Sequence, residues 1–363
     1  MTLEDSTRKI LPYILKPLSW TYGVVADVRN WLFDHNVLTV EEFDVPVVSI
    51  GNLTVGGTGK TPHVEYVVGM LAASCNTVVL SRGYKRKTRG FVLANPNSTP
   101  ESIGDEPMQI YLKHGKTARV AVCENRRKGI KEIMRQFPDT ELILLDDAFQ
   151  HLYVKPKVNV LLMDYNRPVY EDRMLPYGRL REPAHNINRA DMVVVTKCPA
   201  GLQPLSYRLI SKKLGLMPYQ KLYFSNIVYG ALTPVFPDDR PYDVDLSMLT
   251  KRDTVMLLTG IANPRGFVRH FRSYPFKVTV NHYPDHYDFT REDIEGINEK
   301  FQNLKGERKI IVTTEKDAVR LAYNPYFPAS LKPFVFYIPI SVRMVQGLEE
   351  SDFVTDLLKA TGM

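Results

Sequence analysis

The stretch VVSIGNLTVGGTGKTP, residues 47–62, joins a short apolar run to a turn rich in glycine. The β-branched residues of the run favour a buried strand, and a helical pattern follows from Thr61. A glycine-rich turn between a strand and a helix lets consecutive backbone N–H groups point at phosphate oxygens, with the positive end of the helix dipole behind them. The stretch therefore predicts a phosphate-binding site in an α/β protein.

The turn also contains the side chains that such a site uses. Lys60 is suited to the β- and γ-phosphates of a nucleotide, and the Thr61 hydroxyl is suited to Mg²⁺. The strict P-loop pattern has glycine where this chain has Thr54, and a purely structural glycine-rich turn is the alternative. The predicted nucleotide-binding residues are Thr54, Val55, Gly56, Gly57, Thr58, Gly59, Lys60 and Thr61.

A nucleotide site of this kind needs a second acidic element at the end of a neighbouring strand. The run ELILLDD has four apolar residues followed by Asp146 and Asp147. One carboxylate can hold Mg²⁺, directly or through water, and the other can support it or accept a proton. An aspartate pair after a strand is by itself most often a solvated loop, so the glycine-rich turn upstream is what favours a metal site.

Short β-rich runs alternate with helical patterns along the chain. The predicted strands lie at 45–50, 77–81, 91–94, 119–122, 142–145, 158–163 and 192–196, and then at 255–259, 277–281, 309–313 and 334–340. Helical patterns begin near Thr61, Glu106, Asn125 and Tyr207, and a last one covers 349–361. This alternation predicts an α/β, P-loop NTPase-like fold with a doubly wound, mostly parallel sheet and a second, smaller α/β domain. Residues 231–245, rich in proline and aspartate, predict an irregular linker between them.

The composition is that of a globular protein of 363 residues, with 44% hydrophobic and 24% charged residues. The net charge of +7 favours an acidic partner, which leaves nucleic acid, an anionic membrane surface and a phosphorylated substrate open. The three cysteines have no CxxC spacing. They therefore disfavour a disulfide scaffold or a zinc site and indicate a reducing compartment.

The first 35 residues contain apolar residues at helical spacing, with aromatic and basic residues among them. The apolar positions are Leu11, Ile14, Leu15, Leu18, Tyr22, Val25 and Leu32. Two interpretations are open: a helix lying in a membrane interface, or one or two helices packed on the protein's own core and broken near Pro17. No run approaches the roughly 20 apolar residues of a spanning helix, and nothing resembles a cleavable signal peptide.

Three further stretches are candidates for an acceptor site. SRGYKRKTRG, residues 81–90, contains five basic residues, which indicates a solvated face, nucleic-acid binding, or a site for an anionic small molecule or lipid headgroup. GDEP places Asp105 and Glu106 at the start of a helix, where carboxylates are also ordinary capping residues. NHYPDHYDF contains His282, Asp285 and His286, although most such histidines are polar loop residues.

The guanine-recognition element [NT]KxD is incomplete in this chain. VVVTKCP contains Thr196 and Lys197, but Pro199 stands where the aspartate belongs. Adenine, or loose recognition of the base, is therefore favoured.

The whole set of motifs resembles the tetraacyldisaccharide 4′-kinase family of lipid A biosynthesis. The resemblance runs from about residue 10 to the C-terminus and rests on RNWLFD, SIGNLTVGGTGKTP, LSRGY, GDEP, LDDAFQH, LPYGRLREP, GIANP, PDH and TEKDAV, in the family's order. The family's loop resembles TVGGTGKT, which accounts for Thr54. Two departures are small: Ala148 replaces the usual glycine of DDGFQH, and Tyr287 follows His286 where many members have a second histidine.

The resemblance implies transfer of the γ-phosphoryl group of ATP, with Mg²⁺, to the 4′-hydroxyl of a tetraacylated disaccharide 1-phosphate. It implies that Lys60 and Thr61 bind phosphate and Mg²⁺, that Asp146 or Asp147 completes the metal site, and that Asp105 is a general base paired with His286. Further candidates for phosphate or substrate contacts are Arg82, Glu106, Arg126, Gln150, His151 and Arg181.

The resemblance also implies a division of the chain. A membrane-interface helical segment would cover 1–35, the P-loop kinase domain 36–220, and the smaller α/β domain 231–333. Linker strands near 221–229 and 334–342 would join the domains, and a C-terminal helix within 345–363 would return to the first.

An acceptor with four acyl chains lies in the bilayer, so the resemblance favours the interfacial interpretation of the N-terminal segment. It implies a peripheral enzyme on the cytoplasmic face of the bacterial inner membrane, with no nucleic acid and no obligate protein partner. The alternative is a ParA/MinD-like membrane-associated ATPase, whose loop has lysine before the two glycines, where this chain has Val55. A nucleic-acid-associated ATPase using residues 82–89 has no second recognition element.

Overall fold

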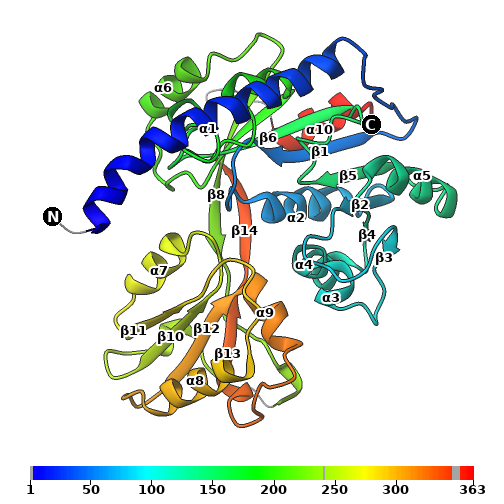
Figure 1. The fold of residues 1–363 in the computed structure, drawn as a ribbon. Coiled ribbons are helices and arrows are strands. Elements are labelled where there is room, and N and C mark those ends of the chain that lie inside the picture. Colours follow the sequence, from blue (N-terminus) through cyan, green and yellow to red (C-terminus); the bar gives the residue numbers. More distant parts are fainter. Residues whose placement is uncertain (1–2, 240–241, 346–351) are drawn as a thin grey trace.

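The computed structural model describes residues 3–239, 242–345 and 352–363, and within these ranges the side chains from Tyr13 onward. The described strands form two sheets, one of nine strands in the order β14-β8-β7-β6-β1-β5-β2-β4-β3 and one of five in the order β11-β10-β12-β13-β9. Figure 1 shows the two sheets one above the other, with β8 and β14 running between them. The predicted α/β class with mostly parallel sheets is confirmed.

The strands are β1 (Val47–Asn52), β2 (Thr77–Ser81), β3 (Val92–Leu93), β4 (Arg119–Val122), β5 (Leu142–Asp146), β6 (Val158–Asp164), β7 (Met192–Thr196), β8 (Lys221–Tyr229), β9 (Thr233–Pro234), β10 (Thr254–Thr259), β11 (Lys277–His282), β12 (Lys309–Thr314), β13 (Val335–Ile338) and β14 (Ile340–Val345). The α-helices are α1 (Leu3–Asp34), α2 (Lys60–Leu71), α3 (Pro100–Ile103), α4 (Asp105–His114), α5 (Arg126–Gln136), α6 (Pro204–Leu214), α7 (Arg265–Arg272), α8 (Arg291–Gln302), α9 (Glu315–Ala322) and α10 (Phe353–Thr361). Short 3₁₀ helices are η1 (Val169–Glu171), η2 (Ala184–Arg189), η3 (Pro237–Asp239), η4 (Leu246–Met248) and η5 (Lys332–Phe334).

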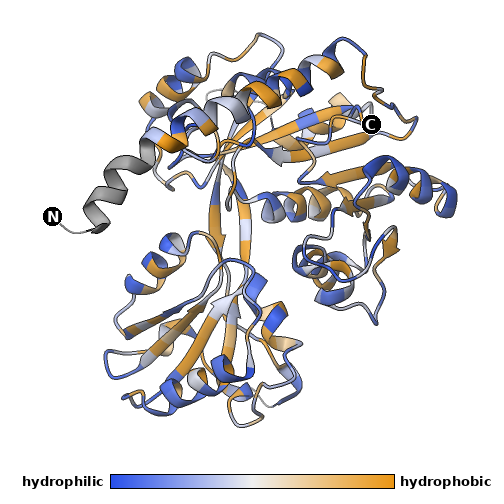
Figure 2. Cartoon of the chain, in the orientation of Figure 1, coloured by the Kyte–Doolittle hydropathy of each residue, from blue (hydrophilic) through white to orange (hydrophobic). Residues whose placement is uncertain are grey.

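The strand β1 lies at the centre of the nine-stranded sheet, parallel to β5 on one side and β6 on the other. Successive residues of β1 and β5 enter different clusters, with Val48 and Leu144 on one face of the sheet and Val47 and Ile143 on the other. Both faces of these strands are therefore buried, which is why their sequences are continuously apolar. Figure 2 shows the hydrophobic centre of both sheets. Because Ile50 pairs with Asp146, the chain leaves β1 beside the carboxyl end of β5.

The connection between the sheets is an antiparallel pair, in which β8 pairs with β14 from Tyr229↔Ile340 onward. The stretch predicted as one strand over 334–342 is instead two strands, since β13 belongs to the five-stranded sheet and β14 to the nine-stranded one. Pro339 stands between them and has no N–H to continue a ladder. The predicted irregular linker over 231–245 contains a short strand, β9, that pairs with β13, and residues 240–241 lie outside the described part. The predicted domain boundaries stay predictions.

The helix α1 is continuous, so the predicted break near Pro17 is wrong. Pro17 lies on the exposed side of the helix, where the carbonyl that loses its N–H partner can bond to water. Figure 1 shows α1 crossing the part of the molecule that contains the nine-stranded sheet, with its N-terminal end extending beyond it. Among the described residues, α1 and the other helices all lack a stretch long and apolar enough to cross a bilayer.

The C-terminal helix α10 packs on the nine-stranded sheet rather than on the five-stranded one. Phe353, Val354 and Leu357 are buried in the same cluster as Val64 of α2 and Val160 of β6. The predicted helical segment began at 345, and residues 346–351 of it lie outside the described part. The last turns of the chain therefore complete the core of the sheet that bears the glycine-rich loop.

We expect Leu357→Ala to destabilise the protein by about 2–5 kcal/mol, because Leu357 is 0% exposed and the substitution leaves a cavity. Urea unfolding followed by circular dichroism measures the change. Leu205→Ala on α6 is the matched control, since Leu205 is 66% exposed and its truncation should change stability by less than about 0.5 kcal/mol. Equal losses in the two variants would contradict the packing of α10.

Candidate active site

The glycine-rich loop, residues 54–61, leaves the end of β1 and becomes the first turn of α2. Gly56 has φ 104° and Gly59 has φ 91°, both in a region that side chains with a Cβ rarely adopt. A Cβ built on Gly57 would meet nothing within 4 Å. The loop therefore curls through conformations that glycine allows and is open on the side of Gly57.

The amides at the end of the loop are available to a ligand. Within the described residues, the N–H groups of Gly57, Gly59, Lys60 and Thr61 donate to no carbonyl. In contrast, the Thr58 amide donates to the Gly56 carbonyl (3.0 Å) and the Val55 amide to the Arg179 carbonyl (2.8 Å). Free amides at a helix N-terminus are the donors that a nucleotide phosphate requires, so the loop fits the predicted ligand.

Side chains form hydrogen bonds with the carbonyls of the loop. The Thr196 hydroxyl donates to the Thr58 carbonyl (2.8 Å), and the Lys197 ammonium donates to the Gly57 carbonyl and to Asp164 (2.7 Å). His63 Nδ1 lies 2.7 Å from the Gly59 carbonyl. From the sequence, Thr196 and Lys197 were recognised only as part of an incomplete guanine motif. In the structure they position the glycine-rich loop.

His63 is buried between the loop and β8, and its Nε2 lies 2.8 Å from the Ser225 hydroxyl. Burial, helped by the positive charge of Lys197, lowers the pKa of His63 to about 4, although the hydrogen bond to the Gly59 carbonyl acts to raise it. The neutral ring must carry its proton on Nδ1, because the Gly59 carbonyl can only accept. Sequence reasoning missed His63, and its only signal was a histidine in the first turn of a helix after the loop.

Lys60 points toward the second acidic residue of the predicted pair, with Nζ 3.6 Å from an Asp147 oxygen. Arg181 contacts both oxygens of Asp147, at 3.0 and 3.4 Å. Burial would raise the pKa of Asp147, but the charges of Lys60 and Arg181 outweigh it and lower that pKa. Asp147 is therefore ionised and fixed beside the lysine of the loop.

Asp146 is almost fully buried at the end of β5, and its Oδ1 has no hydrogen-bond partner among the described residues. Its other oxygen accepts from the Ser81 hydroxyl at 3.2 Å. Burial, together with the charges of Glu106 and Asp147, raises the pKa of Asp146 to about 7. An orphaned carboxylate oxygen with a raised pKa fits a cation.

The protein groups around Asp146 are few, and the described residues contain no group of three or more His, Cys, Asp or Glu side chains that could hold a metal ion. Mg²⁺ commonly binds one or two carboxylates together with water and substrate phosphates, so this donor set suits Mg²⁺ held with a nucleotide. Asp146, Asp147 and Thr61 are the residues that would hold it.

Asp105 and His286, 181 positions apart, lie in contact, with Nδ1 of the ring 3.1 Å from Asp105 Oδ2. Asp105 is the first residue of α4, and His286 follows β11 of the other sheet. We define the α4–α9 ionic cluster as Asp105, Glu106, His286, Lys316 and Arg320. Lys316 Nζ lies 2.8 Å from His286 Nε2 and 3.3 Å from Glu106, and Arg320 Nη2 lies 2.6 Å from Asp105.

The charge state of Asp105 follows from this cluster. Burial would raise its pKa, but hydrogen bonds from His286 and Arg320, with the charge of Arg320, hold the pKa at about 2. The carboxylate is ionised. Sequence reasoning missed Lys316 and Arg320, although TEKDAV was part of the family resemblance and the two cations stand four residues apart in a helical pattern.

The other predicted contact residues lie in different environments. Arg82 is exposed, and Arg126 is buried with its guanidinium on the carbonyls of Cys123 (3.1 Å) and Asp146 (3.1 Å). Gln150 donates to the Asn52 carbonyl at 2.8 Å. Burial and nearby arginines, Arg126 first, lower the pKa of His151 to about 4, and its Nε2 has no partner among the described residues. Their roles stay predictions.

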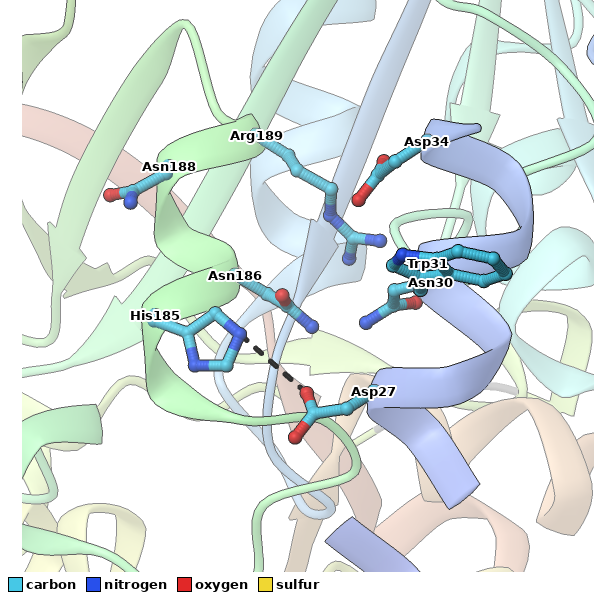
Figure 3. A pocket seen from close by; sticks show the side chains of 8 residues that line it. All are labelled: Asp27, Asn30, Trp31, Asp34, His185, Asn186, Asn188 and Arg189. Atoms are coloured by element: carbon cyan, nitrogen blue, oxygen red, sulfur yellow. Dashed lines mark ion pairs between the residues drawn. The ribbon is translucent and has the colours of Figure 1, made fainter. Parts of the chain in front are cut away.

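A separate polar cavity of about 350 Å³ lies between α1 and η2. Figure 3 shows Asp27, Asn30 and Trp31 on α1 facing His185 and Arg189 on η2, with an ion pair between His185 and Asp27 at 3.6 Å. None of the residues predicted for phosphoryl transfer lines it. The cavity marks where α1 joins the body of the molecule through polar groups.

A mostly parallel sheet with a glycine-rich loop, a lysine at the start of the following helix and an aspartate pair at the end of the neighbouring strand β5 defines a P-loop nucleotide-binding protein. The ionised carboxylate of Asp105 suits phosphoryl transfer. Residues 11–361 match the family described as LpxK: Tetraacyldisaccharide-1-P 4'-kinase. The chain belongs to this family. The ParA/MinD-like alternative is not favoured.

Individual relatives agree with this assignment. The chain is 48% identical to "Tetraacyldisaccharide 4'-kinase" of Bacteroides thetaiotaomicron over 93% of this chain and 90% of the relative. It is 44% identical to the protein of the same name from Phocaeicola vulgatus, over 98% of each chain. Among solved structures, LpxK from Aquifex aeolicus in complex with ATP has a TM-score of 0.69 and 27% identity, covering 96% of this chain and 98% of that one.

We expect His63 to make the protein less stable in mild acid. Its ordinary pKa of 6.5 in the unfolded chain falls to about 4 in the fold, so the unfolded state gains a proton first as the pH decreases. The stability present above pH 6.5 should therefore decrease between pH 6.5 and 4, by about 2 kcal/mol at pH 5. Urea unfolding at pH 7 and pH 5 should show a smaller acid loss in His63→Gln than in the parent.

Proposed function

We infer that this chain is an ATP-dependent kinase that transfers the γ-phosphoryl group to the 4′-hydroxyl of a tetraacyldisaccharide 1-phosphate, a precursor of lipid A. The reaction gives the 1,4′-bisphosphate and ADP. Family membership over nearly the whole chain supports the activity. The observation that carries the assignment of its residues is the contact between Asp105 and His286, which supports an ionised carboxylate paired with an imidazole as the base.

The position of α4 relative to the metal carboxylates supports this arrangement. The charge of Glu106 raises the pKa of Asp146, so the start of α4 lies close enough to Asp146 for the two carboxylates to interact. An acceptor hydroxyl at Asp105 would then be near the nucleotide held by the glycine-rich loop. Positioning of this kind contributes most of the catalysis in phosphoryl transfer.

The chain's own groups then have defined parts in the reaction. The free amides of the loop and Lys60 bind the triphosphate, and Asp146, Asp147 and Thr61 would hold Mg²⁺, whose charge would offset that of the phosphates. Asp105 accepts the proton of the 4′-hydroxyl as the new oxygen–phosphorus bond forms. The bond between the γ-phosphorus and its bridging oxygen breaks, and ADP leaves with the electron pair. Arg82, Glu106, Arg126, Gln150, His151 and Arg181 are the candidate substrate contacts.

The test is incubation of the purified chain with radiolabelled ATP and a lipid A disaccharide 1-phosphate in detergent, followed by separation of a labelled bisphosphate. Lys60→Ala should abolish the product, because the γ-phosphate loses its cation. Lys251→Ala, an exposed lysine beyond the five-stranded sheet, is the matched control and should keep full activity. Full activity of Lys60→Ala would eliminate the loop assignment.

We also propose that the enzyme works as a peripheral protein at the cytoplasmic face of the bacterial inner membrane, on an anionic surface. The side chains of α1 support this, because most of its large apolar ones are exposed, although Phe33 is buried. Trp20 is 71% and Val25 67% exposed, whereas Ser19 and Asn30 face the protein and are buried. An exposed apolar stripe with aromatic residues suits a helix in a membrane interface. The acceptor's four acyl chains require such a location, and no nucleic acid or obligate protein partner is proposed.

Replacing Leu18, Trp20 and Val25 by serine should lower partitioning into phosphatidylethanolamine–phosphatidylglycerol vesicles by about tenfold or more, since partial burial of the three side chains in the interface contributes at least about 1.5 kcal/mol in total. Vesicle sedimentation measures the partition. The control replaces three exposed apolar side chains near the five-stranded sheet, Met248, Tyr323 and Tyr326. Unchanged sedimentation of the α1 variant would favour packing of α1 on the core alone.

A further inference from the structure

We propose that Lys316 and Arg320 of α9 are positioning residues for the proton transfer: they orient the Asp105–His286 pair and make the base depend on the packing of α9 against α4. The inference rests on the proposed kinase function. Neither cation was assigned a role from the sequence, and both belong to the α4–α9 ionic cluster.

Arg320 fixes one oxygen of Asp105. Its Nε and Nη2 both lie on Asp105 Oδ2, at 2.9 and 2.6 Å, and His286 Nδ1 reaches the same oxygen at 3.1 Å. None of the hydrogen bonds between described residues uses the other oxygen, Oδ1. Oδ2 is therefore saturated by donors, and Oδ1 is the oxygen that remains to accept a hydroxyl proton.

The guanidinium of Arg320 is also bonded on the edge that faces away from Asp105. Its Nη1 contacts Asp317 Oδ1 at 3.1 Å. Asp317 is fully buried and accepts from the Gly260 amide (2.8 Å) and the Thr314 hydroxyl (2.7 Å). A planar group bonded along two edges has little freedom to rotate. The carboxylate of Asp105 thus receives its orientation from the five-stranded sheet, through Asp317 and Arg320.

Lys316 determines the proton position on His286. Its ammonium lies 2.8 Å from His286 Nε2 and has only donors, so Nε2 must accept. Arg320 Nη2 also lies 3.1 Å from His286 Nδ1, but it donates to Asp105 Oδ2 at the shorter distance of 2.6 Å. The proton of the neutral ring then sits on Nδ1 and points at Asp105 Oδ2. In this arrangement His286 orients Asp105, and Asp105 Oδ1 accepts the proton. Glu106 (3.3 Å) and Asp285 (3.4 Å) hold the ammonium on its other sides.

The two cations can act together because they lie one helical turn apart on α9, at positions i and i+4. Asp105 and Glu106 are the first two residues of α4. A third ion pair, between Lys113 of α4 and Glu315 of α9 at 3.1 Å, continues the same contact. Because α9 follows β12 of the five-stranded sheet and α4 packs beside β4 of the nine-stranded one, the base is complete only when the two parts are in contact.

The experiment is a double-mutant cycle on the full chain in the bisphosphate assay, with kcat and KM for ATP measured separately. The variants are Arg320→Ala, Lys316→Met, Asp105→Asn and the combination of each cation change with Asp105→Asn. We expect each cation change to lower kcat by about 10- to 100-fold while KM for ATP changes less than about twofold. In the Asp105→Asn background neither change should lower kcat further, because both act through Asp105.

Conservative and distant substitutions complete the design. Arg320→Lys should recover part of the lost kcat, and guanidinium added at millimolar concentration should raise the kcat of Arg320→Ala. Arg291→Ala, which removes a surface arginine paired with Glu295 on α8 (3.1 Å), should leave kcat unchanged. If thermal unfolding shows that Arg320→Ala does not fold, the double-mutant cycle of Lys316→Met with Asp105→Asn tests the inference.

The inference is overturned if the cation changes leave kcat intact, or if their losses multiply with that of Asp105→Asn, which is the behaviour of residues that act independently. Failure of the proposed function has a different signature, since the parent chain would then form no labelled bisphosphate at all.

Discussion

The site depends on a constraint that every backbone segment obeys: a buried amide or carbonyl needs a partner. In the glycine-rich loop the carbonyls of Gly57, Thr58 and Gly59 are taken by Lys197, Thr196 and His63, while the amides that follow stay free. The protein's own side chains thus fix the carbonyl side of the loop, while its amide donors are available. Preorganised donors of this kind bind charge without first having to rearrange.

The two acidic sites near the loop differ because their surroundings differ. Asp147 lies between Lys60 and Arg181 and is ionised, whereas Asp146 is buried beside other carboxylates and has an elevated pKa. A cation supplied with the nucleotide would bring Asp146 to the charged form. Asp105 lies on α4, and its pKa is lowered by His286 and by Arg320 of α9, so its carboxylate is ionised. The groups proposed to hold the phosphates therefore lie with the nine-stranded sheet, whereas Arg320 and His286, which set the charge of Asp105, come from the other part.

Much of the fold could be predicted from the sequence, because apolar runs such as 142–145 and 192–196 are short, uninterrupted and bounded by turns. Asp146 could be placed near the loop since parallel strands end at the same edge of a sheet. One of the two interpretations of the N-terminal segment placed a break near Pro17, which is wrong because an exposed proline costs one hydrogen bond without ending a helix that packs elsewhere. The supporting contacts of Lys197, His63 and Arg320 could not be predicted, as each joins residues more than a hundred positions apart or depends on how the two sheets meet.

The pair β8–β14 connects the two sheets, and the chain passes through it in both directions. Any separation of α9 from α4 must be accommodated by this ribbon, whose ladder of paired strands resists extension but allows twist. For the lipid acceptor proposed above, a joint that twists would let the two parts separate while the ribbon keeps them attached.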